Sequence, residues 1–115
     1  MSDSAGKPVG EVGLFDGLGP EERNGLVADR VFGKAELRGR PFSTDILTAM
    51  LVVERVSDEG FSFKCNVGPD GRAQVSFLAK DGSGVANVQG SSLPVAICNA
   101  ALEIRRRNPL PGAQS

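Results

Sequence analysis

The chain has 115 residues, enough for one domain, and a formal net charge of −1. That balance argues against a general nucleic-acid binder, which would carry a basic field. The sequence has no histidine and no apolar run long enough to span a bilayer. We therefore expect no membrane contact, no metal or other cofactor, and no enzyme activity.

The N-terminal third predicts a tail followed by a helix. Residues 1–12 are small, polar and punctuated by Gly and Pro, which is typical of a flexible segment. A first helix is expected from Pro20, a residue favoured in the first helical turn, to Phe32. Gly33 then fits the left-handed position that ends many helices.

The second predicted helix covers residues 43–56. Ser43 is the expected N-cap, which places Asp45 at the second helical position near the positive end of the helix dipole. Phe42 and Leu47 have the spacing of a hydrophobic staple across this cap. Because the helix is apolar nearly all round, we expect it to be buried on more than one side.

After this helix the hydrophobic period changes to two. The alternation predicts strands over 61–67, 72–79 and 84–88, joined by turns rich in Gly, Pro and Asp. A last helix with one apolar face is expected over 92–107. The fold class is therefore α+β, an α-α-β-β-β-α sandwich in which helices pack on an antiparallel three-stranded meander.

The domain is expected to cover residues 13–108, followed by a C-terminal tail over 109–115. Its predicted core contains Phe61, Phe63, Val75, Ile97 and Ala101. Cys65 and Cys98 also fall on predicted core faces, and we expect both to be reduced thiols.

Three blocks of sequence resemble the phage ABA-sandwich domain family. They are Leu26–Gly33, Phe42–Ile46 with Val52–Val56, and Leu93–Leu102, and the similarity covers roughly residues 20–104. A tryptophan often follows the glycine of the first block in that family, whereas Lys34 stands there in this chain. The resemblance implies a small protein made by a phage or prophage, located in the host cytoplasm and usually without a catalytic role.

The chain is also similar to viral anti-defence proteins that act as nucleotide sponges, of the Thoeris anti-defence type. Such proteins are usually oligomers whose pockets hold phosphate with arginines and a base with an aromatic ring. The resemblance implies a homo-oligomer that binds a small anionic ligand. The residues that would supply the ligand site are Arg23, Phe77, Asn87, Arg105 and Arg106.

Several of these residues also have a structural interpretation. The arginines over 105–107 sit where cations meet the negative end of a helix dipole. Phe77 shares its strand face with other apolar residues and fits a core position. Asn87 is expected to be buried, or to lie at a sheet edge where its amide finds partners.

Two functions follow from the sequence and its resemblances. The first is a non-catalytic phage accessory protein that sequesters a phosphate-bearing signal, of the cyclic nucleotide or cyclic ADP-ribose type. Residues 61–115 carry six Lys/Arg and three Asp/Glu, a surplus of +3 that would attract such an anion. The alternative is a phage protein that acts only through protein–protein contacts, as a host-takeover inhibitor or as a structural or packaging accessory.

Overall fold

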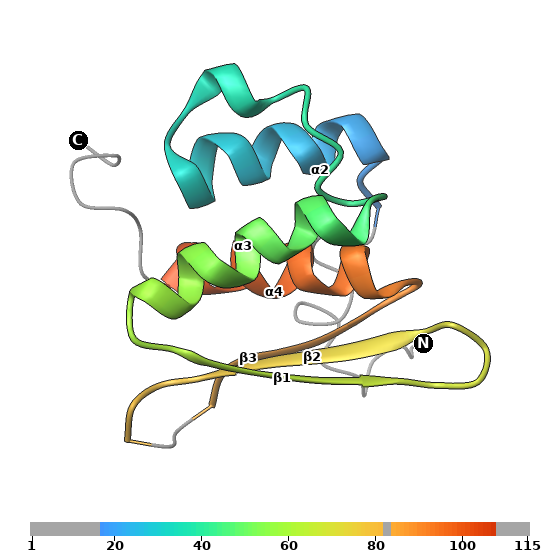
Figure 1. Cartoon of the computed structure of the whole chain (residues 1–115), viewed down its shortest axis with the longest axis vertical. Helices are drawn as coiled ribbons and strands as arrows, with labels where there is room; N and C mark the ends of the chain where they lie inside the picture. Colours follow the sequence, from blue (N-terminus) through green and yellow to red (C-terminus); the bar gives the residue numbers. More distant parts are fainter. Residues whose placement is uncertain (1–16, 82–83, 108–115) are drawn as a thin grey trace, which may run out of the picture.

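The described helices of the protein lie on one side of a three-stranded sheet. The computed structural model describes residues 17–81 and 84–107. Its elements are α2 Pro20–Leu26, η1 Val27–Phe32, η2 Ala35–Leu37, α3 Ile46–Asp58, β1 Ser62–Val67, β2 Ala73–Leu78, β3 Gly84–Gly90 and α4 Leu93–Arg107 (Figure 1). This order confirms the predicted α+β class. The predicted tails over 1–12 and 109–115 lie outside the described residues.

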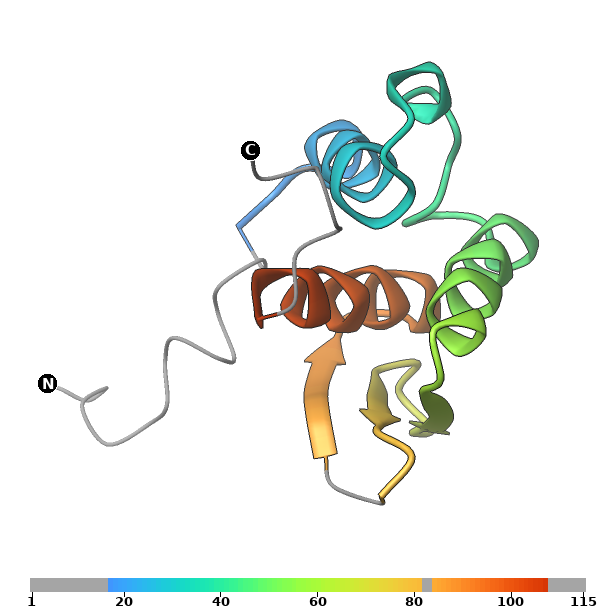
Figure 2. The same ribbon diagram turned by 90° about the vertical axis from the view of Figure 1, so that its left-hand side faces the viewer.

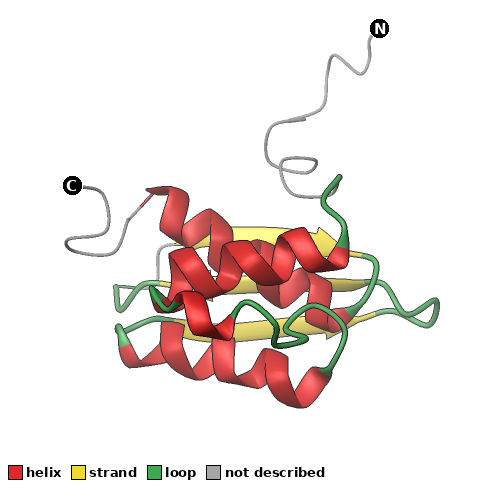
Figure 3. Ribbon diagram, turned by 90° about the horizontal axis from the view of Figure 1, so that it is seen from above, coloured by secondary structure: helices red, strands yellow, loops and turns green. Residues whose placement is uncertain are grey.

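The sheet is an antiparallel meander with strand order β1-β2-β3. Its register sets Cys65 opposite Val75 and Val75 opposite Val88. Since side chains alternate between faces, this row points toward the helices and its neighbours in sequence point away. Figures 2 and 3 show the helices above one face of the sheet only. The other face is left uncovered by the helices of residues 17–81 and 84–107.

The first helical segment runs from Pro20 to Phe32, as predicted, but its second half is a π-helix. The Glu22 carboxylate accepts the backbone N–H of Gly19 at 3.0 Å, which closes the N-terminus. Gly33 has φ 68°, the left-handed conformation predicted for the end of the helix. The backbone N–H of Lys34 then reaches the carbonyl of Ala28 at 2.9 Å.

The predicted N-cap of α3 is wrong by two residues, because Asp45 and not Ser43 is the N-cap. The Asp45 carboxylate accepts the backbone N–H of Thr48 at 2.9 Å and its hydroxyl at 2.7 Å. These bonds to Thr48 hold the pKa of the Asp45 carboxyl below its usual range. Ser43 is instead buried, and both its N–H and its hydroxyl donate to the side-chain oxygen of Asn24.

The expectation that α3 is buried on more than one side is also wrong. The helix lies at the flank of the molecule and buries one stripe, made of Ala49, Val52, Val53 and Val56. Leu47 is 77% exposed, so it does not staple the cap. Phe42 is fully buried and stacks on Phe32 instead, with ring centroids 5.3 Å apart.

The core is centred on α4, which packs on β2 and β3 below it and on η1 and α3 around it. Val75, Ile97 and Ala101 are fully buried, as predicted. Phe61 and Phe63 are only partly buried against this core, because α4 packs on β2 and β3 and β1 lies at the sheet edge beyond it. Within residues 17–81 and 84–107, no helix has the length and apolar character needed to cross a membrane.

Candidate functional site

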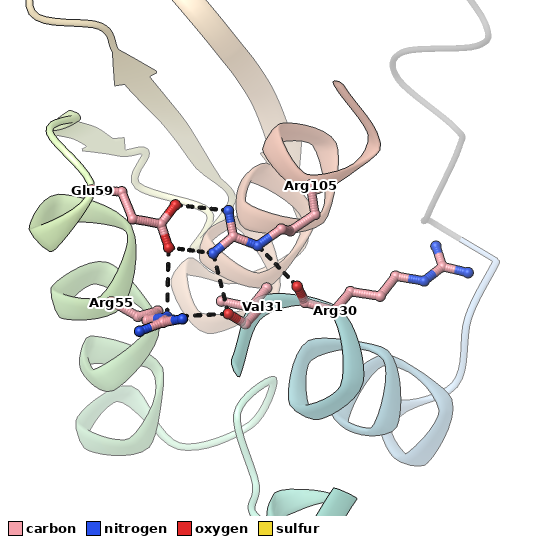
Figure 4. A network of polar contacts seen from close by, with 5 residues as sticks. All are labelled: Arg30, Val31, Arg55, Glu59 and Arg105. Atoms are coloured by element: carbon pink, nitrogen blue, oxygen red, sulfur yellow. Dashed lines mark hydrogen bonds and ion pairs between the residues drawn. The ribbon is translucent and has the colours of Figure 1, made fainter. Parts of the chain in front are cut away.

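Arg105 lies at the centre of a polar network that joins α4, α3 and η1 (Figure 4). Its guanidinium donates to the Glu59 carboxylate, at 2.7 Å for the Nη1–Oε1 bond, and to the carbonyls of Arg30 at 2.8 Å and Val31 at 3.2 Å. The side chain is 4% exposed. Arg55 approaches the same carboxylate at 3.5 Å and the same Val31 carbonyl at 3.3 Å.

This network gives Arg105 a structural task. The last carbonyls of a helix have no partner within the helix, and a cation from elsewhere can satisfy them. Arg105 does so for η1, while Glu59 balances its buried charge. In Figure 4 the side chain of Arg30 points away from the cluster, so Arg30 contributes its carbonyl only. The donors of Arg105 are therefore directed at the protein itself.

The other two predicted arginines also contact the protein's own side chains. Arg23, on α2, is 5% exposed and its Nε donates to Asn99 of α4 at 2.9 Å. Arg106 donates to Glu103 one turn earlier on α4, with its Nε at 3.2 Å from the carboxylate. Half of the Arg106 side chain is exposed, so it is the most accessible of the three predicted arginines.

Phe77 and Asn87 point to opposite faces of the sheet. Phe77 is fully buried beneath α4 and contacts the ring of Phe63, with centroids 5.6 Å apart, so the core interpretation is confirmed. Asn87 is exposed on the uncovered face and accepts a hydrogen bond from Gln74 at 2.9 Å. The structure thus does not gather the five predicted residues into one site.

The uncovered face around Asn87 carries two rows of polar side chains. One row is Lys64, Ser76 and Asn87, and the other is Asn66, Gln74 and Gln89, each taken from β1, β2 and β3 in turn. We call these six residues the open sheet face. It contains four amides, one hydroxyl and one ammonium, and no carboxylate.

Two shallow hollows run along this face and share Asn66 and Gln74. The first, of about 420 Å³, includes Lys64 and Ser76. The second, of about 390 Å³, includes Gln89 and the hairpin residues Asp70 and Arg72. The Asp70 carboxylate accepts the backbone N–H of Arg72 at 3.0 Å, so it is engaged in holding the turn.

The alternation of polar and apolar residues along the strands could have predicted the open sheet face. The same alternation that placed Phe63 and Val75 toward the core places Lys64 and Gln74 on the opposite face. The sequence does not reveal that the described helices leave this opposite face uncovered, because that depends on the path of the chain. Asn87 was the only member of the open sheet face predicted as a site residue.

The two cysteines differ in environment, and both are free. Cys98 is buried on α4, and burial raises the pKa of its thiol to about 12, although the nearby charge of Arg23 opposes this shift. Cys65 lies on the helix-facing side of β1, as predicted, but it is exposed and does not join the core. No group of three or more Cys, Asp or Glu side chains within the described ranges is placed to hold a metal ion.

The geometry defines a small α+β sandwich in which helices cover one face of an antiparallel sheet and a polar face stays open. The sequence model of the Phage ABA sandwich domain family matches residues 20–102. This is more than half of the chain, so the protein belongs to that family and the predicted resemblance is confirmed. No curated protein and no solved structure matches the chain.

Proposed function

We propose that this phage protein binds a small anionic ligand of the nucleotide class on its open sheet face and sequesters it without chemical change. The observation that carries the proposal is the composition of that face. Lys64 supplies a cation, and the amides of Asn66, Gln74, Asn87 and Gln89 supply donors and acceptors. Surfaces that meet only water usually mix both signs of charge, but these two rows contain no carboxylate.

The dimensions of the face suit a nucleotide. Neighbouring strands lie about 4.8 Å apart, so the distance from β1 to β3 is roughly 10 Å. Amide side chains can form paired hydrogen bonds with the edge of a base. An ammonium group such as that of Lys64 is a common phosphate ligand. The base would then bind to the amide side chains of Asn66, Gln74 and Gln89. We expect the ligand to be a signalling molecule of the cyclic nucleotide or cyclic ADP-ribose type.

Sequestration without turnover is supported by the reactive groups of the chain. The sequence contains no histidine, the usual general base. Cys98 is buried with a raised pKa, so its thiol is a poor nucleophile at neutral pH. Cys65 is exposed, but the chain offers no histidine to activate its thiol. The ligand would therefore leave the protein as it arrived.

Calorimetry with cyclic ADP-ribose isomers and with cyclic di- and trinucleotides tests the proposal. Lys64→Ala should weaken binding by roughly tenfold or more, since a charge-assisted hydrogen bond contributes about 1.5–3 kcal/mol. Arg106→Ala is the matched control, because it removes an accessible cation that lies outside the open sheet face. Its affinity should equal that of the unchanged protein.

Two results would contradict this site. A loss of affinity in Arg106→Ala with no loss in Lys64→Ala would move the ligand to the end of α4. The absence of heat with every nucleotide would remove the ligand altogether. The alternative, in which a host-takeover inhibitor or structural accessory acts only through protein contacts, would then be the leading function.

A further inference from the structure

The outward surface of α3 combines a protruding apolar side chain with an apolar hollow. Leu47, in the first turn, is 77% exposed. Met50 and Leu51, three and four residues later, are 38% and 39% exposed and lie on the same stripe of the helix. Isolated exposed apolar residues are common, but a group on one helix face marks an interaction surface.

The hollow lies beside the C-terminal half of α3 and has a volume of about 340 Å³. Its apolar lining consists of Phe32, Leu37, Phe42 and Leu51. Its charged lining consists of Lys34, Arg40, Glu54, Arg55 and Asp58. An apolar floor with a charged rim is the arrangement that receives an anchoring side chain at protein interfaces.

We propose that this surface binds a second copy of the chain. In the pair, the two α3 helices run antiparallel across a two-fold axis, and Leu47 of each copy enters the hollow of the other. Leu47 precedes Glu54, at the hollow, by seven residues, or about 10.5 Å along the helix. A two-fold axis near Leu51 exchanges these two positions, so both contacts form at once.

The second copy is the occupant that this surface fits best, because the protrusion and the hollow lie at opposite ends of one helix. Such a surface is self-complementary, as an isologous interface requires. The rim contains cations from the loop before α3, such as Arg40, and carboxylates from α3, such as Glu54. Each copy therefore offers both signs of charge to an identical rim. The pairing goes beyond the proposed ligand site, since it uses a different surface of the molecule.

Sedimentation equilibrium of the full chain tests the pairing. The expected mass is twice the 12.0 kDa of one chain. Leu47→Glu should raise the dissociation constant of the dimer about a hundredfold, because two buried leucines are lost per dimer. Val67→Glu is the matched control, since Val67 is an apolar residue of β1 that is 53% exposed and lies outside the α3 surface. It should leave the mass unchanged.

A mixing experiment tests the exchange of Leu47 between copies. Leu47→Glu removes the protrusion, and Leu37→Lys fills the hollow with a cation. Each variant alone should be a monomer, but a mixture should dimerise. In the mixed dimer one intact Leu47 meets one intact hollow, and the second contact sets the introduced glutamate beside the introduced lysine. Leu37→Gln replaces Leu37→Lys if circular dichroism shows that the latter is unfolded.

Three results would overturn the proposal. The first is an unchanged chain that stays at 12.0 kDa, which would leave this surface to a different protein. The second is a dimer that Val67→Glu dissociates as readily as Leu47→Glu. The third is a mixture of folded variants that remains monomeric wherever the unchanged chain is dimeric.

Discussion

Single residues were the least predictable part of this molecule, and the arginines show why. The sequence places three arginines at the end of the last helix, and a cluster of cations suggests an anion site. In the structure Arg105 is buried against Glu59 and two carbonyls of η1, from which it is separated by more than 45 positions in sequence. These arginines do act as hydrogen-bond donors, as predicted. The acceptors that they bind depend on tertiary contacts, which no local sequence pattern reveals.

The buried network predicts a large loss of stability in Arg105→Ala. The substitution leaves the Glu59 carboxylate and the carbonyls of η1 without their main donor, and losing a hydrogen bond to a charged group costs about 1.5–3 kcal/mol. Urea denaturation followed by circular dichroism measures the free energy of unfolding. Arg38→Ala is the control, because Arg38 pairs with Asp29 on the surface, where ion pairs contribute little. Equal stabilities of the two variants would mean that the Arg105 network is not formed in solution.

At the scale of the elements, the sequence predicted nearly everything about type and order. All three strands and three of the helical segments lie where alternation and helical spacing placed them. Two predictions about α3 were wrong, namely which residue is its N-cap and how much of its surface is buried. Ser43 and Asp45 are both good N-caps, and the choice was decided by Asn24, which binds Ser43 from another helix. One side of α3 is exposed because the helix lies at the edge of the helical layer. The amino-acid composition of the helix does not predict this position.

The end of β3 approaches the start of α4 closely at Gly90, so a side chain there should destabilise the protein. A Cβ added at Gly90 would lie 2.6 Å from the backbone nitrogen of Ala96 and 2.9 Å from its Cα. Backbone atoms cannot move aside, so Gly90→Ala should destabilise the protein by about 1–3 kcal/mol.

Gly25→Ala is the matched substitution within α2. A Cβ at Gly25 meets no atom within 4 Å, and alanine favours the helix, so we expect a gain of about 0.4–1 kcal/mol. Both effects are measured as shifts of the urea midpoint. A neutral Gly90→Ala would show that α4 does not sit this close to β3 in solution.

At the scale of the whole molecule, α4 is the element that contacts both the sheet and the other helices. It lies between the sheet and η1 and also packs against α3. Hydrophobic patterning predicted that this helix has one apolar face, yet its residues from Ala96 to Arg105 are all buried. The buried polar members of that stretch include Asn99 and Glu103. They are buried because the first helical segment covers them, which is a property of the assembled fold.

The central place of α4 predicts that Cys98 becomes accessible only when the whole domain unfolds. Its thiol is fully buried with a pKa raised to about 12, whereas thiol reagents need the thiolate. A Cys65→Ser variant leaves Cys98 as the single thiol, and its labelling can be followed by mass spectrometry at pH 8 in increasing urea. The free energy of opening obtained from labelling should equal the free energy of unfolding from circular dichroism, with the same urea slope.

The pH dependence of this experiment has a definite sign. The folded-state pKa of Cys98 lies above the reference value of 9.0, so the stability that its burial contributes is complete below pH 9. It is lost as the pH rises toward 12, because the unfolded thiol ionises first. The unfolding free energy of the Cys65→Ser variant should therefore fall above pH 9 by up to about 1.4 kcal/mol per pH unit relative to a variant that also carries Cys98→Ala. Labelling with a shallow urea slope would contradict the prediction, since it would mean that α4 separates from the sheet while the remaining domain stays folded.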